Sequence, residues 1–284
     1  MKLLISLTLF GYILYSQPAE QSRNSPISIL SIIQQKQEVL ETPELDFDPE
    51  WVDSLKLILP CDGVSVPRRT MRLPNAPRDY RSGIHRGIDF FANWGTPVKA
   101  VADGIVIRAD HYYEEVPADF RENMLETSAR VGNTPSDIFN SILLGKAVFL
   151  DHGFDLVPGF RVITIYAHLS HIENNVTPGN LIKGGNFVGN SGNTGMREST
   201  LGSKAGSHLH WEMILQKGEQ EIYLGHNIPN PELYNMLTAI FNRKLLEIKK
   251  GRYNLPFFGI VLTLFKNPSA LPGLGLFQNP RQES

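Results

Sequence analysis

The sequence predicts a mainly β fold: an antiparallel sheet of the barrel-sandwich kind, with a helical insertion and a helical carboxy-terminal extension. Between residues 61 and 226, short apolar runs alternate with glycine and proline signals, as in TPVKAVADGIVIRA, KAVFLDHG and FRVITIYAHL. Such runs are typical of strands joined by tight turns. The 284 residues are 42% hydrophobic, enough to bury a substantial core. We therefore expect one main domain over residues 61–226.

Residues 110–145 interrupt the strand pattern and are predicted to form the insertion. Four apolar side chains recur there at helical spacing: Ile138, Phe139, Ile142 and Leu143. Ser136, which follows Pro135, is a candidate N-cap for this helix. The acidic first half of the insertion either flanks a groove or packs against the side of the sheet.

Residues 227–284 form the predicted extension. They contain the helix-like segment PELYNMLTAIFNRKLLEIKK and then the eleven-residue apolar run LPFFGIVLTLF. That run is too short to span a bilayer, which needs about 20 residues. We expect the extension to pack on the domain or to contact a partner, either a protein or a membrane.

The amino terminus has the composition of an export signal. Lys2 precedes thirteen mostly apolar residues, 3–15, and polar residues follow Ser16. We predict a signal peptide over residues 1–16 and a polar leader and linker over residues 17–60. An uncleaved anchor is the alternative, because Leu14 is a poor match three residues before the cleavage site. The protein is expected in the periplasm or cell envelope, or secreted.

Charge and cysteine content exclude two classes of protein. The 27 basic residues are scattered and balanced by 29 acidic ones, which gives no electrostatic case for binding nucleic acid. The single Cys61 excludes an intramolecular disulfide and any multi-cysteine zinc site. We expect a free, packed thiol. The sequence does not indicate the oligomeric state.

The stretch GSHLHWEM places two histidines one residue apart. In a strand, residues two apart share a face, so His208, His210 and Glu212 line one surface while the intervening apolar side chains face the core. The same alternation in VITIYAHL puts His168 on the face of Tyr166, from which it could join the other two histidines. Glu212 either orients a ligand from behind or is a solvated strand residue.

A second histidine motif, HRGIDFF, lies upstream. Gly87 between His85 and Asp89 argues against a helix and for a turn that brings both side chains to one point. Together with a histidine of the HxH strand they make a mixed His, Asp, His set. Such a set suits a borderline metal such as zinc, with the fourth position left for water.

Taken together, these motifs resemble the lysostaphin-type (LytM-like) zinc metallo-endopeptidases, which cleave peptide bonds in bacterial cell-wall peptidoglycan. The resemblance runs roughly over residues 60–215. It rests on HxxxD, GTPVKAVADGIV, YAHLS, VGNSGNTG and the HxH that is followed by WE, all in this order. It implies a fold of the duplicated hybrid motif type, with a groove whose floor holds the metal.

The resemblance also implies an exported enzyme that hydrolyses peptide cross-links of peptidoglycan. In this family pattern one Zn²⁺ is bound by His85, Asp89 and His210. His168 and His208 are the catalytic groups beside it, and the sequence does not divide the roles of general base and oxyanion stabiliser between them.

Two other functions remain open. A non-catalytic LytM-like regulator of another wall hydrolase would share the fold, but such modules usually have eroded metal sites, and all five positions are filled here. A phosphocarrier-like domain of the sugar phosphotransferase type also pairs two histidines in a groove. The export signal and Asp89 count against it.

A few further residues have weaker signals. Tyr80 and Arg81, just before the first ligand motif, either line the substrate groove or are loop residues without function. His152, in the DHG turn between two predicted strands, is expected to have a structural role.

Overall fold

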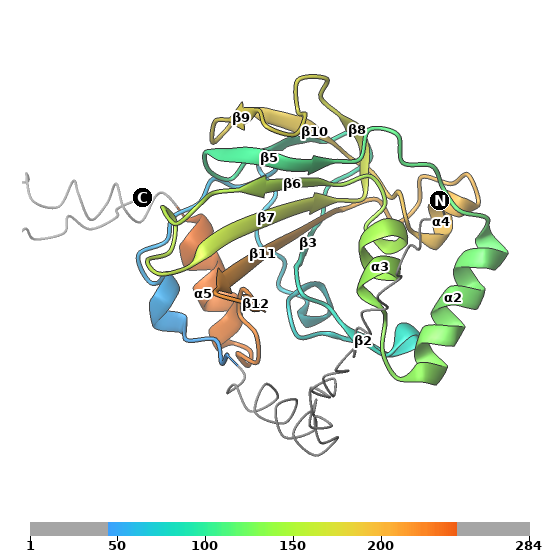
Figure 1. Cartoon of the computed structure of the whole chain (residues 1–284), viewed down its shortest axis with the longest axis horizontal. Coiled ribbons are helices and arrows are strands. Elements are labelled where there is room, and N and C mark those ends of the chain that lie inside the picture. Colours follow the sequence, from blue (N-terminus) through green and yellow to red (C-terminus); the bar gives the residue numbers. More distant parts are fainter. Residues whose placement is uncertain (1–44, 243–284) are drawn as a thin grey trace, which may run out of the picture. The chain divides into compact units, whose positions relative to one another are not determined.

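The computed structural model describes residues 45–242 (Figure 1). Its largest sheet has seven strands, and every pairing in it is antiparallel. The order is β12 (Gln220–Tyr223), β11 (Leu209–Lys217), β7 (Arg161–Ala167), β6 (Val148–Asp151), β5 (Gly104–Ala109) and β9 (Leu181–Ile182), with β3 (Ile88–Phe90) also paired to β11. The predicted mainly antiparallel β fold is confirmed.

Two smaller antiparallel sheets flank the large one. One has the order β4 (Pro97–Lys99), β10 (Phe187–Ser191) and β8 (Leu169–Ile172), and the other pairs β1 (Pro77–Arg78) with β2 (Gly83–Ile84). His168 is the single residue between β7 and β8, so the chain passes there from the large sheet to the three-stranded one. An isolated bridge between Gly192 and His208 links the end of β10 to the start of β11.

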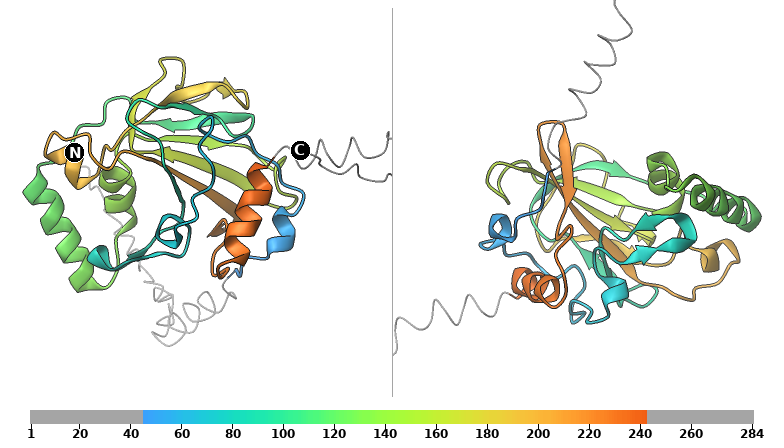
Figure 2. Two further views of the ribbon diagram at one scale, coloured as in Figure 1. Left: turned by 180° about the vertical axis from the view of Figure 1, so that it is seen from behind. Right: turned by 90° about the horizontal axis from the view of Figure 1, so that it is seen from below.

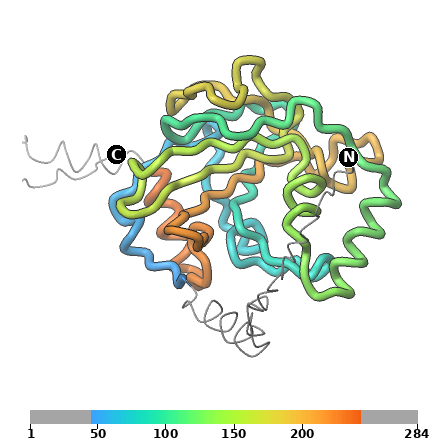
Figure 3. Tube along the Cα trace, viewed as in Figure 1, coloured from blue at the N-terminus to red at the C-terminus, as the bar shows by residue number. Residues whose placement is uncertain are grey.

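The predicted helical insertion is present between β5 and β6, and Figure 3 shows its course in the Cα trace. It consists of α2 (Ala118–Val131) and of α3 (Ser136–Ile138), which continues as a π-helical turn over Phe139–Leu143. The predicted cap is wrong. Pro135 occupies the N-cap position with a ψ of 144°, and Ser136 already lies in the first helical turn without a side-chain capping bond.

The remaining helical segments are short, apart from the ten-residue α5. They are η1 (Pro49–Val52), η2 (Thr70–Arg72), η3 (Asp79–Arg81), α4 (Arg197–Thr200) and α5 (Glu232–Phe241). The views of Figure 2 agree in placing α2 and α5 at opposite ends of the domain. Among residues 45–242, no helix has both the length and the apolarity to cross a membrane.

The core extends beyond the predicted limits of residues 61 and 226. Side chains of residues 45–60 and of α5 belong to the same buried cluster as the sheet: Phe47, Val52, Leu55, Leu57, Leu233, Leu237, Ile240 and Phe241. The Phe241 ring packs edge-on against Trp211 of β11 and Phe90 of β3, at centroid distances of 5.3 and 5.6 Å. These contacts fix the strands whose opposite face bears the polar site.

Cys61 is free and buried, as expected, and burial raises the pKa of its thiol to about 12. The thiol is therefore protonated at neutral pH. The predicted signal peptide, residues 17–44 of the leader and residues 243–284 of the extension lie outside the described residues.

Candidate metal centre

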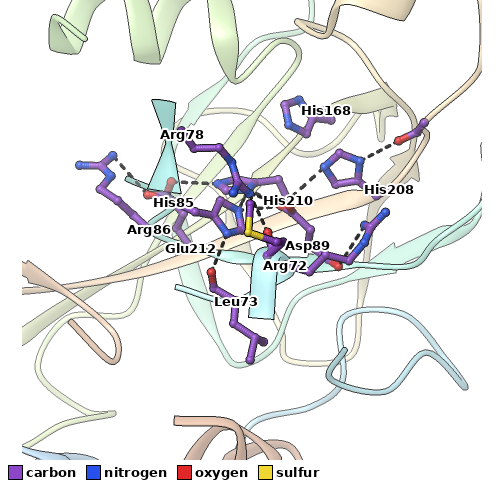
Figure 4. Close-up of polar contacts among 12 residues, drawn as sticks. Arg72, Leu73, Arg78, His85, Arg86, Asp89, His168, His208, His210 and Glu212 are labelled. Carbon is purple, nitrogen blue, oxygen red and sulfur yellow. Dashed lines mark hydrogen bonds and ion pairs between the residues drawn. The ribbon is translucent and has the colours of Figure 1, made fainter. Parts of the chain in front are cut away.

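The three side chains predicted as metal ligands meet at one point (Figure 4). His85 Nε2 lies 2.8 Å from Asp89 Oδ1 and 3.0 Å from His210 Nδ1, and His210 Nδ1 lies 2.8 Å from the same Asp89 oxygen. All three residues are buried. The sheet register explains the approach, because Asp89 on β3 stands directly opposite His210 on β11.

Gly87 allows the segment with His85 and Asp89 to lie close to β11. A Cβ atom at this position would lie 2.5 Å from the Trp211 carbonyl oxygen and 2.9 Å from His210 Cε1. Gly87 does not have a positive φ, so its backbone conformation does not require glycine. Glycine is required because the backbone of β11 lies so close. A bend at Gly87 joins β2 to β3, and the connection is non-helical as expected.

The hydrogen bonds of the two imidazoles fit a bound cation. His85 Nδ1 donates to the Leu73 carbonyl oxygen at 2.9 Å, and His210 Nε2 donates to Glu212 Oε1 at 2.9 Å. In these tautomers the other ring nitrogens carry lone pairs, and both lone pairs face the Asp89 carboxylate in a buried site. Such an arrangement is repulsive without a positive charge, and its donor atoms are those that zinc prefers.

In the metal-free protein a proton can supply that charge. Burial lowers the pKa of His210, but its hydrogen bonds to Asp89 and Glu212 outweigh this effect and raise the pKa to about 9. Burial alone would raise the pKa of Asp89, yet the neighbouring His85, His208 and His210 hold it well below its usual range. A metal ion therefore meets an ionised carboxylate and displaces a proton from His210.

Glu212 is buried, so the solvated alternative for this residue does not hold. Its side chain is 0% exposed, and its second oxygen lies 3.2 Å from Arg86 Nη2. Burial would raise the pKa of Glu212, but His210 and Arg86 lower it overall. The ionised carboxylate accepts the His210 Nε2 proton and so turns Nδ1 toward His85 and Asp89.

His168 and His208 stand beside this cluster, with their ring centroids 4.9 Å apart (Figure 4). Each ring donates from Nδ1 to a backbone carbonyl at 2.8 Å, His168 to Thr194 and His208 to Gly206. His208 Nε2 lies 3.5 Å from Asp89 Oδ1. Burial, with the neighbouring histidines, holds the pKa of His168 well below its usual range. Both rings thus keep Nε2 available for proton transfer.

Strand alternation gives the wrong face for His168. Ala167 pairs with His210 and shares its face, whereas Tyr166 pairs with Trp211 on the core side. Regular alternation would therefore send His168 toward the core with Tyr166. Instead β7 ends at Ala167, and His168 has a left-handed φ of 59°, which turns its side chain to the metal side.

A cavity of about 480 Å³ opens over the cluster. The predicted ligands and the two histidines predicted to be catalytic line it, and the insertion supplies Arg121, Glu122, Leu125, Phe139, Leu143 and Leu144. The insertion therefore flanks the groove. Tyr80 and Arg81 also line the cavity, but Arg81 is buried and donates to the Thr134 hydroxyl and the Ile84 carbonyl at 3.1 Å, which ties the insertion to η3.

The other four histidines are absent from the cavity lining: His111, His152, His171 and His226. His152 is buried, with Nδ1 against the Asp103 carbonyl oxygen at 2.6 Å and Nε2 against the Thr164 hydroxyl at 2.8 Å. These two bonds give it the structural role that the sequence predicts.

Sequence reasoning missed several arginines near the cluster, among them Arg78 and Arg121. Arg78 Nη2 lies 3.3 Å from Asp89 Oδ2, and nothing in the sequence around β1, which bears Arg78, indicates this contact. Arg121 on α2 also lines the cavity. It lies four residues before the buried Leu125, so helix periodicity could have placed it on the inward face.

A buried His, Asp, His cluster with two further histidines in a groove is a donor set that suits a catalytic zinc site. Residues 127–222 match the model of peptidase family M23. This match confirms the resemblance to lysostaphin-type (LytM-like) peptidases. The match includes His168, His208 and His210 but begins after His85 and Asp89.

Several known proteins are similar to the chain. A curated protein of Buchnera aphidicola subsp. Baizongia pistaciae (strain Bp), described as an uncharacterized metalloprotease, is 25% identical over 223 residues, and the match covers 78% of this chain and 44% of that protein. The chain thus spans less than half of that relative.

Two solved structures are more distant. The catalytic domain of the antimicrobial peptidase lysostaphin from Staphylococcus simulans is 23% identical, with 60% of this chain and 87% of that chain covered and a TM-score of 0.29. A zinc containing peptidase from Vibrio cholerae is 20% identical, with 60% and 35% covered and a TM-score of 0.30.

Proposed function

We propose that the chain is a zinc-dependent metallo-endopeptidase that hydrolyses peptide cross-links of bacterial peptidoglycan. The observation that carries the proposal is the convergence of His85 Nε2, Asp89 Oδ1 and His210 Nδ1 within 3.0 Å of one another at the groove. The family match supports peptide hydrolysis. The lysostaphin-type motifs support peptidoglycan as the substrate.

The chemistry divides between the metal and the chain. Zinc held by His85, Asp89 and His210 would supply a Lewis acid that activates water and polarises the scissile carbonyl. His168 and His208 transfer protons: one accepts the proton of the attacking water, and the other stabilises the oxyanion or protonates the leaving amine. The carbonyl groups of Thr194 and Gly206 hold the two rings so that Nε2 of each is free for this work.

The purified protein should contain about one zinc per chain, as expected of a site with three protein ligands. It should also release new amino and carboxyl ends from purified peptidoglycan, identified by mass spectrometry. A chelator should stop the reaction, and added zinc should restore it. Folded protein that is supplied with zinc and still binds no metal would remove the enzymatic proposal. Zinc binding without turnover would favour the non-catalytic regulator instead.

We also propose that the protein is exported, because peptidoglycan lies outside the cytoplasm and residues 1–16 have the composition of a signal peptide. The mature chain should be found outside the cytoplasm and should begin near Gln17. Cell fractionation with amino-terminal sequencing measures both properties. A cytoplasmic product that retains Met1 would argue against export and return weight to the phosphocarrier-like alternative.

A further inference from the structure

Arg121 is a half-buried cation in the wall of the groove. Its Nε donates to the Gly195 carbonyl oxygen at 2.9 Å. Within residues 45–242, no ion pair joins its guanidinium to a carboxylate, so Nη1 and Nη2 keep their hydrogen-bonding capacity. The fork of an arginine matches a carboxylate in geometry and charge. A ligand in the groove can therefore complete the coordination of this side chain.

The other arginines that the cavity wall carries beside Arg121 already have ion-pair or hydrogen-bond partners. Arg197 pairs with Glu122 at 2.8 Å, and the neighbouring Glu198 also acts on Arg197. Arg81 is held by its hydrogen bonds to Thr134 and Ile84. Arg121 is therefore the residue of this wall that is best placed to bind an anion.

The floor of the groove adds further positive charge. Arg78 Nη2 lies 3.3 Å from Asp89 Oδ2, while Asp89 Oδ1 faces the two histidine ligands. A divalent metal bound by one carboxylate and two neutral imidazoles leaves a net positive charge at the centre. Four arginines line the cavity against three carboxylates: Arg78, Arg81, Arg121 and Arg197 against Asp89, Glu122 and Glu198. With a divalent metal bound, positive charge is in excess, which makes the groove attractive to an anionic substrate.

Arg121 is attached to the segment that also holds a predicted catalytic histidine. Arg121 is bonded to the carbonyl of Gly195, and the preceding carbonyl, of Thr194, holds Nδ1 of His168. The same short segment thus anchors a catalytic group and the unpaired cation. An anion bound by Arg121 would therefore lie in the same cavity as the predicted metal ligands and catalytic histidines.

Building on the proposed peptidase function, we propose that the groove selects peptides with a free carboxylate close to the scissile amide, and that Arg121 of the insertion is the specificity-determining residue that binds it. Arg78 contributes a second cation. A neutral peptide of the oligoglycine kind leaves Arg121 without a partner. Such a peptide should bind more weakly, because it lacks the charged hydrogen bonds to Arg121.

The test compares two synthetic cross-link peptides that differ in one group, a carboxylate or a carboxamide on the residue after the scissile bond. Non-cleavable analogues, with a methyleneamine in place of the amide, are titrated into the zinc-loaded protein by calorimetry. The carboxylate analogue should bind roughly 10- to 100-fold more tightly, the usual worth of a charged hydrogen bond. The ratio of kcat/KM for the cleavable pair should show the same preference.

Variants assign the preference to a residue. Arg121→Gln should reduce the ratio to about one, and Arg121→Lys, which keeps the charge, should retain part of it. Arg130→Gln removes the same charge from an exposed position of α2 whose guanidinium contacts Thr127, and it should leave the ratio unchanged. Circular dichroism verifies the folding of each variant.

The outcomes separate the inference from the function on which it rests. Equal binding of the two analogues by the unmodified protein, or an unchanged preference in Arg121→Gln, would overturn the role of Arg121. Equal hydrolysis of both peptides would overturn the inference and leave the peptidase proposal standing. A carboxylate preference in binding without any hydrolysis would support the recognition and contradict the peptidase.

Discussion

Replacing His210 by alanine should abolish zinc binding and peptidase activity together, whereas His208→Ala should keep the metal and lower activity by roughly 10²- to 10⁴-fold. His210 supplies one of the three atoms that converge within 3.0 Å, so its loss leaves two protein ligands. His208 Nε2 lies outside that triangle, at 3.5 Å from Asp89 Oδ1, and its Nδ1 is held by the Gly206 carbonyl. Its removal takes away a proton-transfer group and no ligand.

Zinc content and hydrolysis rate are measured on the same preparations, with circular dichroism to verify folding. His168→Ala should behave like His208→Ala, because its ring is also held at Nδ1 by a backbone carbonyl. His171→Ala, at an exposed position outside the cavity lining, is the matched control and should keep both properties. Loss of zinc in His208→Ala as complete as in His210→Ala would refute the separation of roles. Full activity in His208→Ala would make His208 a bystander.

Much of the site was predictable because two local patterns determine it. Alternation along β11 puts His210 and Glu212 on one face whatever the partner strand is, since side chains in a strand repeat every two residues. The spacing of His85 and Asp89 around Gly87 gave the expected bend. What these patterns could not give is the register that sets Asp89 opposite His210, because strand pairing is a long-range property.

His168 shows where periodicity fails. His168 has a left-handed φ of 59°, which turns its side chain to the opposite face of the sheet. The spacing of apolar residues in the sequence does not indicate such a change. The conformation follows from the passage of the chain out of β7 into β8 of another sheet. The family resemblance predicted the correct neighbourhood for His168 where alternation did not.

The limits of the domain and the role of the insertion also depend on tertiary contacts. Residues 45–60 fall within the predicted leader and linker, yet Leu55 and Leu57 are buried against the sheet. The Leu57 amide donates to the Ile240 carbonyl of α5 at 2.9 Å. Likewise, the sequence of α2 is amphipathic, but this pattern does not predict what the inner face of the helix packs against. Only the folded chain shows Arg121 and Leu125 at the groove.

Gly87→Ala should damage the metal centre although Gly87 has no side chain and binds nothing. The added Cβ would lie 2.5 Å from the Trp211 carbonyl oxygen, 2.8 Å from Glu212 Cγ and 2.9 Å from His210 Cε1. Because the first of these atoms belongs to the backbone of β11, β3 must move away from it. Overpacking of this kind lowers the free energy of unfolding by about 1–3 kcal/mol. Displacing His210 and its carboxylate partner should also weaken zinc binding by roughly 10- to 100-fold.

Thermal unfolding and zinc affinity, the latter by competition with a chromophoric chelator, are measured for Gly87→Ala and for Gly63→Ala. Gly63 has a φ of 73° and open space around the site of a Cβ. Its replacement should cost a comparable amount of stability, about 1–2 kcal/mol from backbone strain, while leaving the zinc affinity unchanged. If both variants lost stability and both kept their zinc affinity, the close approach at Gly87 would not control the metal site. Equal loss of zinc affinity in both would mean that the site responds to global stability and not to the contact between Gly87 and β11.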